Sequence, residues 1–428
     1  MSPQLTLQTP LELVPSEVPT YLEQLWSPEQ QGSTGTGAST FCLLIWQPAL
    51  AEQHLVRSGR LHGPITGQQT KDLIAAGRQA IADADLPLST PPLDGPVIEA
   101  VSRLEGDSAA EDLRGQYIDP ALSALMPRRL ITLAPTIAPS QGLETLVAAY
   151  CPLPEEGGGT TACGDVVVLR GGDAALQDGM TILEPLLPAS MPTWVWWNGF
   201  LDEAPELMAR LACAPRRLII DSAVGQPRQC LEVLRQRVES GQAVNDLNWL
   251  RLRSWRETLA MVFDPPHRRD ALSHVTQLDI DVEGHHPAQG LLLAAWIADR
   301  LGWTLDTAST VDEETTAEFH RPDGTAVNVH LMGVPVGQPN LHAGQIVGMR
   351  LICQPENSKG VCVILCADSG GCMRLEGGGM ANLELHEDIV PVQHATPEMD
   401  VARLLGGGHD STNPLLAAAA PLAAKLLG

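Results

Sequence analysis

Hydrophobic runs and polar breaks alternate along the first two thirds of the chain, and this alternation separates expected strands from expected helices. Short apolar runs predict strands at residues 41–46, 128–134, 145–151, 164–171, 193–197 and 216–222. Apolar residues at helical spacing predict helices at 68–85 and 173–189, and another from about residue 203. Strands that alternate with helices indicate a mostly parallel sheet with helices on its faces.

The last third of the chain has a different pattern. A strand at 274–284 and a helix at 287–303 are followed by short alternating runs between 316 and 387, which turn signals separate. These runs predict an antiparallel meander, and a helix pair at 397–405 and 412–427 closes the chain. The expected fold class is therefore α/β, with mostly parallel βαβ regions followed by a C-terminal α+β region that contains an antiparallel meander.

These patterns divide the chain into four expected parts. Residues 1–37 are polar and rich in Pro, Gly, Ser and Gln, which predicts a flexible N-terminal arm. An N-terminal α/β domain is expected over 38–185 and a central α/β segment over 186–270. The C-terminal α+β domain is expected over 271–428.

Composition and charge exclude several classes of protein. The chain has 428 residues, 44% of them hydrophobic, and a formal charge of −24. So acidic a chain repels phosphate backbones and anionic lipid, which argues against nucleic acid or a membrane surface as its partner. It contains no apolar run of 18 residues and no leader pattern, and its nine cysteines are too scattered for a secreted disulfide scaffold. We therefore expect a cytoplasmic protein.

The stretch PTWVWWNG (192–199) places three of the nine tryptophans in one predicted strand. In a strand, Trp194 and Trp196 face one side and Trp197 faces the other. Asn198 follows at the carboxyl end, where open α/β sheets place ligands. One interpretation is a central strand packed on both faces. The other is an aromatic anchor for a protein partner, because tryptophan is enriched in interface hot spots.

The segment 245–266 is predicted to form one amphipathic helix. Asn245 or Asp246 can cap its start, and Pro265 ends it. Its apolar residues recur at a spacing of 3.6, which is typical of a core helix. Arg256, at the edge of this stripe, could pair with a carboxylate inside the protein or on a partner. The candidate partner-binding residues of this segment are Trp249, Arg251, Arg253, Trp255 and Arg256.

Two cysteines stand at the ends of the predicted turn ADSGG. Folding of this hairpin would bring Cys366 and Cys372 close to opposite each other, within the range that a disulfide can bridge. Cys353 and Cys362 could also face each other, so these four cysteines leave three pairings open. Their spacing fits a zinc site poorly, and no metal is expected. Buried thiols in a reducing compartment are the remaining interpretation.

Sequence motifs give little support to an enzyme. No complete G-x-G-x-x-G follows a predicted strand, and neither G-x-x-x-x-G-K-[ST] nor G-x-S-x-G occurs. The clusters that come nearest to catalytic ones are His285–His286 and His409–Asp410–Ser411, and the local pattern explains both better as a loop and a helix cap. We expect no catalytic residue and no cofactor. The alternative is a stand-alone enzyme that binds a sugar phosphate or a nucleotide on the same α/β sheet.

A resemblance to a known family rests on four stretches. PTWVWWNG, RRLIIDS, DLNWLRLRSWRETLAMVFDPP and LLLAAWIADRLGW resemble, in order and spacing, the OpcA family of glucose-6-phosphate dehydrogenase assembly or effector proteins. The resemblance covers roughly residues 38 to 303. It implies a non-catalytic adaptor that binds the oligomeric dehydrogenase of the oxidative pentose phosphate pathway and raises its activity. The late cysteines resemble the cyanobacterial branch, which is associated with thioredoxin-linked control. With that resemblance, Cys366 and Cys372 become the favoured redox pair, and thioredoxin an expected partner.

Overall fold

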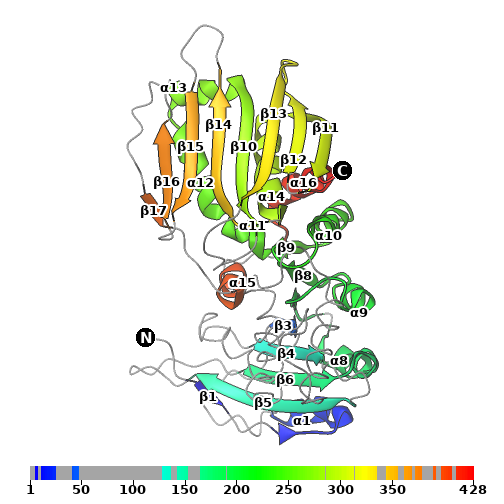
Figure 1. Ribbon diagram of the computed structural model, residues 1–428. Coiled ribbons are helices and arrows are strands. Elements are labelled where there is room, and N and C mark those ends of the chain that lie inside the picture. The colour runs from blue at the N-terminus through cyan, green and yellow to red at the C-terminus, as the bar shows by residue number, and fades with distance from the viewer. Residues whose placement is uncertain are drawn as a thin grey trace, which may run out of the picture. The chain divides into compact units, whose positions relative to one another are not determined.

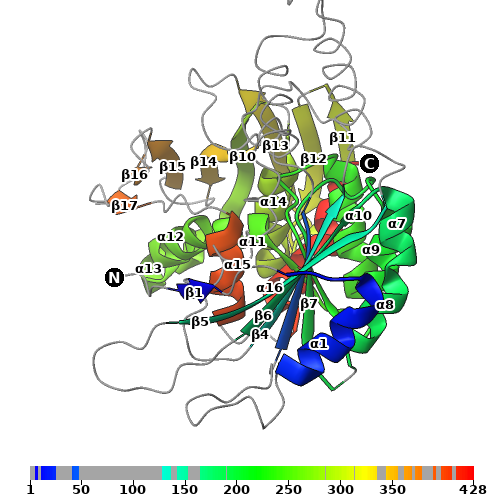
Figure 2. The same ribbon diagram turned by 90° about the horizontal axis from the view of Figure 1, so that it is seen from below.

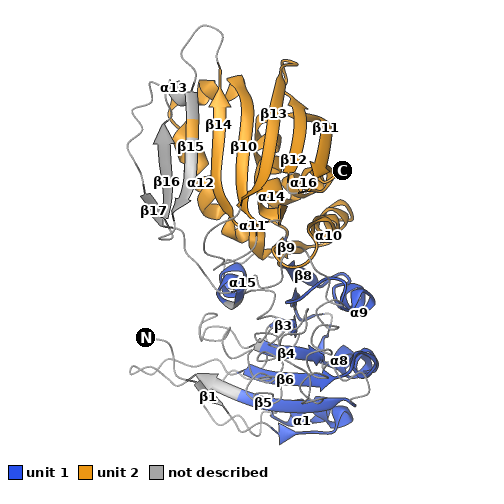
Figure 3. Ribbon diagram, viewed as in Figure 1, with its two compact units in different colours: residues 1–56, 66–220, 397–411 blue, residues 57–65, 221–396, 412–428 orange. Residues whose placement is uncertain are grey.

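The chain separates into two compact units, each built around one sheet (Figure 3). Unit 1 comprises residues 1–56, 66–220 and 397–411, and unit 2 comprises 57–65, 221–396 and 412–428. The computed structural model describes residues 5–7, 11–25, 41–47, 128–135, 142–152, 164–188, 190–284, 286–312, 314–334, 344–354, 361–368, 372–377, 389–391, 397–406 and 411–428. The predicted helix at 68–85 and the predicted strand at 381–387 lie outside these residues.

The sheet of unit 1 is mostly parallel, as the sequence predicts. Its parallel strands are β3 (Phe41–Trp46), β4 (Arg128–Pro135), β6 (Gly164–Gly171), β7 (Thr193–Trp197) and β8 (Arg217–Ile220). They lie in the order β6-β4-β3-β7-β8, so the first parallel strand of the chain is central and the strand order reverses beside it. This is the order of a doubly wound α/β sheet. Antiparallel strands continue it beyond β6: β5 (Glu144–Pro152), β1 (Leu5–Leu7) and β2 (Leu11–Glu12).

Helices cover this sheet, and α7 (Asp173–Asp178), α8 (Met180–Leu186) and α9 (Pro205–Leu211) among them lie where the apolar pattern predicts helices. Together with α1 (Val18–Leu25), these helices lie along one side of the fanned strands in Figure 2. The predicted helix at 173–189 is divided at Gly179, which ends α7 and begins α8. Helix α15 (Pro397–Gly406) also belongs to unit 1.

The expectation of a flexible arm is wrong for residues 11–25. This stretch forms β2, the short 3-10 helix η1 (Pro15–Glu17) and α1. Val18 and Leu22, one turn apart, are 0% and 2% exposed. Burial of these two side chains offsets the cost of ordering the polar residues around them.

The sheet of unit 2 is mostly antiparallel. Its strands are β10 (Val275–Glu283), β11 (Thr304–Val311), β12 (Glu314–His320), β13 (Ala326–Val334), β14 (Ile346–Cys353), β15 (Val361–Asp368), β16 (Cys372–Gly377) and β17 (Ile389–Pro391). Their order is β11-β12-β13-β10-β14-β15-β16-β17. The prediction of a simple antiparallel meander is therefore wrong in one respect. Strand β10 lies between β13 and β14 and runs parallel to β13. The apolar helix α14 (Ala288–Leu301) causes this, since it crosses the sheet after β10 and the hairpins that follow return beside that strand.

One face of this sheet carries the helices of unit 2. These are α10 (Pro227–Glu239), α11 (Leu247–Arg251), α12 (Arg253–Phe263), α13 (Pro266–Arg269), α14 and α16 (Pro414–Leu426), with the 3-10 helix η2 (Asp270–His274). In Figure 1, α12, α14 and α16 lie behind the strands. Helix α14 approaches the sheet closely at Gly290, where a Cβ atom would lie 2.4 Å from Cδ1 of Leu331. None of the helices in the described part of the chain is long and apolar enough to cross a bilayer.

Candidate functional site

Strand β7 holds three of the predicted partner-binding tryptophans in the core of unit 1. Trp196 and Trp197 are 1% and 0% exposed, and Trp194 is 8% exposed. Trp194 meets the edge of Phe41 at a centroid distance of 5.7 Å, and the guanidinium of Arg217 lies 4.7 Å from the centre of its ring. These indoles pack against this chain itself. Their contact with a partner stays a prediction, which requires them to become accessible.

The carboxyl ends of β3 and β7 meet where the strand order of unit 1 reverses. Trp46, the last residue of β3, stacks on Trp197, the last residue of β7, with ring centroids 4.5 Å apart and an interplanar angle of 5°. Asn198 donates from its side-chain amide to Oε1 of Gln47 at 3.0 Å and from its backbone N–H to the carbonyl of Trp46 at 3.1 Å. The indole N–H of Trp46 donates to Glu203.

The ends of β3 and β7 can be compared with the dinucleotide site of doubly wound sheets. In doubly wound sheets the switch point receives the dinucleotide, and its first turn needs glycines so that the backbone can approach the pyrophosphate. Here two stacked indoles and an amide pair occupy the ends of the two strands, and QPALAEQH follows Trp46 without a glycine. The described side chains at this position therefore build a packed core.

In unit 2, the predicted helix at 245–266 is divided into several elements. The strand β9 (Val244–Asp246) precedes it, α11 starts after Asp246, α12 starts at Arg253, and α13 follows Pro265. The capping prediction is confirmed for Asp246, whose carboxylate accepts hydrogen bonds from the backbone N–H groups of Asn248 and Trp249. Leu252 ends α11 and begins α12, which the continuous apolar stripe did not reveal.

A buried polar network holds α11 in place. The Asp246 carboxylate accepts from the backbone N–H and the hydroxyl of Ser222, both at 2.8 Å. The Asn248 side chain donates to that hydroxyl at 3.1 Å and accepts from the Gln289 side chain of α14 at 2.7 Å. Gln289 in turn accepts from the backbone N–H of Ile346 at the start of β14. Polar groups from four segments are thus satisfied inside unit 2, which fixes the start of α11 against the sheet.

The surroundings of this network shift the pKa of its carboxylate, that of Asp246. Burial raises the pKa of Asp246 to about 6, and the negative charge of Asp221 adds to the increase. The hydrogen bonds from Ser222 and Asn248 oppose this shift. His286, two residues before α14, is also buried, and burial lowers its pKa. Its Nε2 atom lies 2.9 Å from the carbonyl oxygen of Gly225.

The three predicted arginines of this segment differ in their contacts. Arg251 forms a bidentate pair with Asp221, with both N–O distances at 2.8 Å and both side chains close to 10% exposed. Arg253 pairs at 2.7 Å with Glu257 one turn along α12, and both of these side chains are exposed. Arg251 therefore forms an ion pair inside unit 2, whereas Arg253 forms one on the surface.

The third predicted arginine, Arg256, lies over an aromatic ring of its own segment. Its guanidinium lies 3.8 Å from the centre of the Trp249 ring and donates to the carbonyl oxygens of Trp249 and Leu252. No carboxylate pairs with it among the residues that the structure describes. Burial lowers the pKa of Arg256 to about 10, although the group stays cationic at neutral pH. Trp249 and Trp255 are each 4% exposed and pack inward.

The predicted hairpin that carries the redox pair forms from β15 and β16, but its register differs from the expectation. Cys366 lies opposite Arg374, and Cys372 lies opposite Asp368, because the loop is three residues long. The two cysteines therefore occupy diagonal positions of the ladder, where Cα atoms are roughly 7–8 Å apart. The sequence predicted them close to opposite each other, and the register places them two residues out of step instead. The bond between them stays a prediction. Their side chains lie outside the described residues.

The other described cysteines differ in their burial. Cys42 and Cys230 are buried, and burial raises the pKa of the Cys42 thiol. Cys213 is exposed in the loop after α9. Cys353 is buried on β14 and lies opposite Val361, whereas Cys362 lies opposite Ile352. These two positions are thus not direct cross-strand neighbours.

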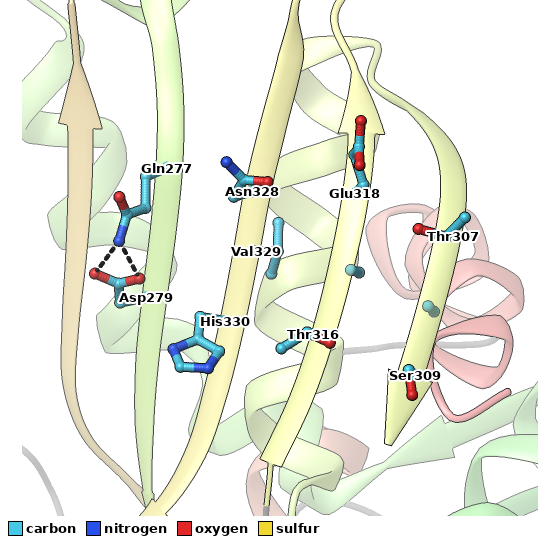
Figure 4. A pocket seen from close by; sticks show the side chains of 11 residues that line it. Gln277, Asp279, Thr307, Ser309, Thr316, Glu318, Asn328, Val329 and His330 are labelled. Carbon is cyan, nitrogen blue, oxygen red and sulfur yellow. Dashed lines mark hydrogen bonds between the residues drawn. The ribbon is translucent and has the colours of Figure 1, made fainter. Parts of the chain in front are cut away.

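The sheet of unit 2 also presents a hollow on the face away from its helices (Figure 4). The hollow measures about 480 Å³ and extends over β10, β13, β12 and β11. Its polar lining includes Gln277, Asp279, Glu318, Asn328 and His330. This hollow was not predicted from the sequence, although alternating polar positions on four strands could have indicated an open sheet face.

Three side chains at the edge of this face could ligate a metal. Atoms of Asp306, Glu318 and His320 lie within 4.8 Å of one another. All three residues are exposed or half-buried, and clusters of this kind occur in proteins without a metal. We assign no metal to them.

The predicted partner-binding residues do not form one cluster within either unit. Trp194, Trp196, Trp197 and Asn198 belong to unit 1, whereas the residues from Trp249 to Arg256 belong to unit 2. The buried residues Asp221, Ser222 and Gln289, which support the second group, were not singled out from the sequence. These residues lie far apart in the chain and meet only in the folded structure, so no local sequence pattern could have revealed them.

Comparison with known proteins places this chain in a family. A model described as the N-terminal domain of a glucose-6-phosphate dehydrogenase subunit matches residues 119–236. A second, described as the C-terminal domain of such a subunit, matches residues 242–420. The two matches cover most of both sheets.

Cyanobacterial relatives match over nearly the whole chain, and all carry the name OxPP cycle protein OpcA. The protein of Synechococcus elongatus is 32% identical over 410 residues, which are 93% of this chain and 92% of the relative. That of Synechocystis is 31% identical, with 94% and 89% covered, and that of Nostoc punctiforme is 30% identical, with 92% and 89% covered. The chain belongs to the OpcA family.

Solved structures with a similar arrangement are remote. A 3-ketoreductase from Actinomadura kijaniata, KijD10, is 12% identical, with 60% of this chain and 79% of that chain covered and a TM-score of 0.33. UDP-N-acetylglucosamine 3-dehydrogenase GnnA from Acidithiobacillus ferrooxidans is 11% identical, with 54% and 76% covered and a TM-score of 0.32. Likeness at this level carries no argument about function.

Proposed function

We propose that this chain is a non-catalytic partner of glucose-6-phosphate dehydrogenase that binds the enzyme and raises its activity. The observation that carries the proposal is membership of the OpcA family, with both halves of the chain matched by domains described as parts of a dehydrogenase subunit. The pathway in the relatives' name, abbreviated OxPP, agrees with a role in the oxidative pentose phosphate pathway. We place this function in the cytoplasm.

A role without chemistry of its own is supported by the switch point of unit 1. The ends of β3 and β7 hold the Trp46–Trp197 stack and the Gln47–Asn198 pair, which build a core where dinucleotide enzymes place an open glycine turn. This favours an adaptor over the alternative of a stand-alone nucleotide- or sugar-phosphate-binding enzyme. The dehydrogenase then supplies the catalysis, and this chain supplies a binding surface.

Docking is proposed to use the exposed part of the arginine-bearing segment in unit 2. Arg253 is accessible, and Arg256 is a partly buried cation held over Trp249 without a described carboxylate. An acidic group of the dehydrogenase would gain a charge-assisted hydrogen bond there without further ordering of the arginine. Trp255 would support this surface from the core of unit 2. The tryptophans of β7 are proposed as a separate contact in unit 1, which requires them to become accessible.

Redox control is proposed to act at the β15–β16 hairpin. The register leaves Cys366 and Cys372 two positions out of step, so a disulfide between them requires the tip of the hairpin to change its pairing. Oxidation would remove two electrons and two protons from the thiols, and thioredoxin dithiol would return them through a mixed disulfide. We propose that the disulfide form binds and activates the dehydrogenase and that the dithiol form releases it.

Binding is tested by mixing the purified chain with the dehydrogenase of the same organism. Light scattering after size exclusion should show a complex heavier than either protein, and the chain alone should show no dehydrogenase activity. Separate elution of the two proteins under both oxidising and reducing conditions contradicts the proposal. A rise in melting temperature of the isolated chain with sugar phosphate or nicotinamide cofactor, without a complex, favours the enzyme alternative.

A further inference from the structure

The uncovered face of the unit 2 sheet has an ordered pattern of polar side chains. Because directly paired residues point to the same face, the register defines rows that cross β11, β12, β13, β10 and β14. The central row consists of Ser309, Thr316, His330, Asp279 and Arg350. A second row contains Thr307, Glu318, Asn328 and Gln277, and a third contains Val311, Glu314, Met332 and Asp281.

These rows carry an excess of negative charge. They contain four carboxylates, those of Asp279, Asp281, Glu314 and Glu318, and one guanidinium, that of Arg350. The guanidinium is already bound to Asp279, and Glu314 pairs with His330. The pKa of Asp281 is raised by burial and further by the charge of Asp279, which indicates that the carboxylates on this face repel one another.

The centre of this face is hollow because its side chains are short. Thr307, Ser309 and Thr316 stand where β11 and β12 meet, so the longer side chains of β10 and β13 form one wall and Glu318 forms part of the other (Figure 4). At the edge of the face, Met332 and Val311 are 39% and 65% exposed. The face thus combines hydrogen-bond acceptors in a hollow with an accessible apolar margin, a combination common in protein interfaces.

We propose that this face, named here the acidic sheet face, docks a positively charged segment of the protein partner. A lysine or arginine of that segment enters the hollow and binds Glu318, while Met332 and Val311 contact its apolar neighbours. The inference rests on the proposed function for the identity of the partner and adds a second docking surface to it. In the part of unit 2 that the structure describes, no helix covers this face in Figure 1.

Charge decides between the candidate occupants. A phosphorylated sugar or a nucleotide would place its anionic group beside carboxylates in a hollow whose lining contains no lysine or arginine. A second copy of this chain, packed face to face, would bring four carboxylates against four. A basic protein segment is the occupant that the electrostatics favour, because opposite potentials both steer association and select partners.

Titration calorimetry of the wild-type chain with the dehydrogenase tests this inference. Glu318→Lys reverses one charge in the hollow, and we expect binding at least tenfold weaker. Thr316→Trp fills the hollow without a change of charge, and we expect a similar loss. The matched control is Glu206→Lys on α9, an exposed glutamate of unit 1, which should bind within twofold of the wild type. Melting temperatures check that each variant is folded.

The outcomes separate this inference from the proposed function. If the wild type binds but Glu318→Lys and Thr316→Trp bind equally well, the acidic sheet face is not a docking surface and the proposed function stands. If Glu206→Lys weakens binding as much as Glu318→Lys does, the effect belongs to the net charge and the inference is overturned. If the wild type does not bind at all, both proposals fall.

Discussion

Ser222 donates two hydrogen bonds to the buried carboxylate of Asp246, one from its backbone N–H and one from its hydroxyl, each 2.8 Å long. Asp246 also caps α11. A single carboxylate thus joins a loop to the helix that precedes the arginine-bearing surface. Since that carboxylate lies in the interior, its ionisation connects the stability of unit 2 to pH.

The buried Asp246 should make unfolding pH-dependent between pH 4 and pH 7. Its folded pKa of about 6 exceeds the ordinary value of 3.8, so its contribution is fully present below pH 3.8 and is lost as the pH rises through 6. The loss amounts to about 3 kcal/mol. Asp246→Asn cannot ionise, so the difference in unfolding free energy between wild type and variant should shift by that amount across this range. Urea denaturation at several pH values measures it, and parallel profiles would refute the assignment.

Removal of Arg251 should destabilise the chain through the charge that it leaves behind. Asp221 then stays buried without the bidentate guanidinium, a loss that costs about 3 kcal/mol in comparable cases. Arg251→Ala should therefore be much more harmful than the double variant Arg251→Ala with Asp221→Ala, which removes both charges. Chemical denaturation of the two single variants and the double variant gives the coupling energy. Strictly additive losses would show that the pair does not act as a unit.

The Trp46–Trp197 stack should be a stabilising core element. Trp46→Ala removes a side chain that is 0% exposed and should cost about 3–5 kcal/mol. Trp46→Phe keeps an aromatic ring over Trp197 and should cost less than half as much. The melting temperatures of both variants, measured together with the wild type, provide the comparison. Equal losses for Ala and Phe would mean that stacking contributes little.

Gly290 should tolerate no side chain. A Cβ atom there would lie 2.4 Å from Cδ1 of Leu331 and 2.9 Å from Cγ1 of Val282, so these buried side chains or α14 would have to shift. We expect Gly290→Ala to cost about 1–3 kcal/mol despite the better helix propensity of alanine. Gly406→Ala at the end of α15 is the matched control, because the described residues beyond its own helix and chain neighbours place no atom within 4 Å of the added Cβ. A stabilised Gly290→Ala variant would contradict the close packing.

Local patterns allowed the parallel strands of the unit 1 sheet and β5 to be predicted well, whereas β1 and β2 were expected as part of a flexible arm. The predicted strand 193–197 and β7 have the same bounds, because five buried residues stand between Pro192 and Asn198–Gly199. The cap at Asp246 was also readable, since side-chain type and position determine it. Signals that lie within a few residues of one another are available in a sequence.

Features that depend on residues far apart were not predictable. The insertion of β10 between β13 and β14 depends on where α14 packs, and the buried network joins Ser222, Asn248 and Gln289 across 67 positions of the chain. The register of the cysteine hairpin depends on its loop length, which DSGG alone leaves open. Leu252 divides the predicted helix although its side chain continues the apolar stripe.

Redox-dependent activation of glucose-6-phosphate dehydrogenase is the most direct test of the account. Initial rates of the enzyme are measured with the oxidised chain, with the chain reduced by thioredoxin, and with the variants Cys366→Ser, Cys372→Ser and Arg256→Gln. Arg210→Gln on α9, at an exposed pair outside the proposed docking surface that contributes little, is the control for the last variant. We expect activation by the oxidised wild type, loss of activation on reduction, no response to reductant in either cysteine variant, and weaker activation by Arg256→Gln than by Arg210→Gln. A dehydrogenase whose rate is the same with and without the oxidised chain would contradict it.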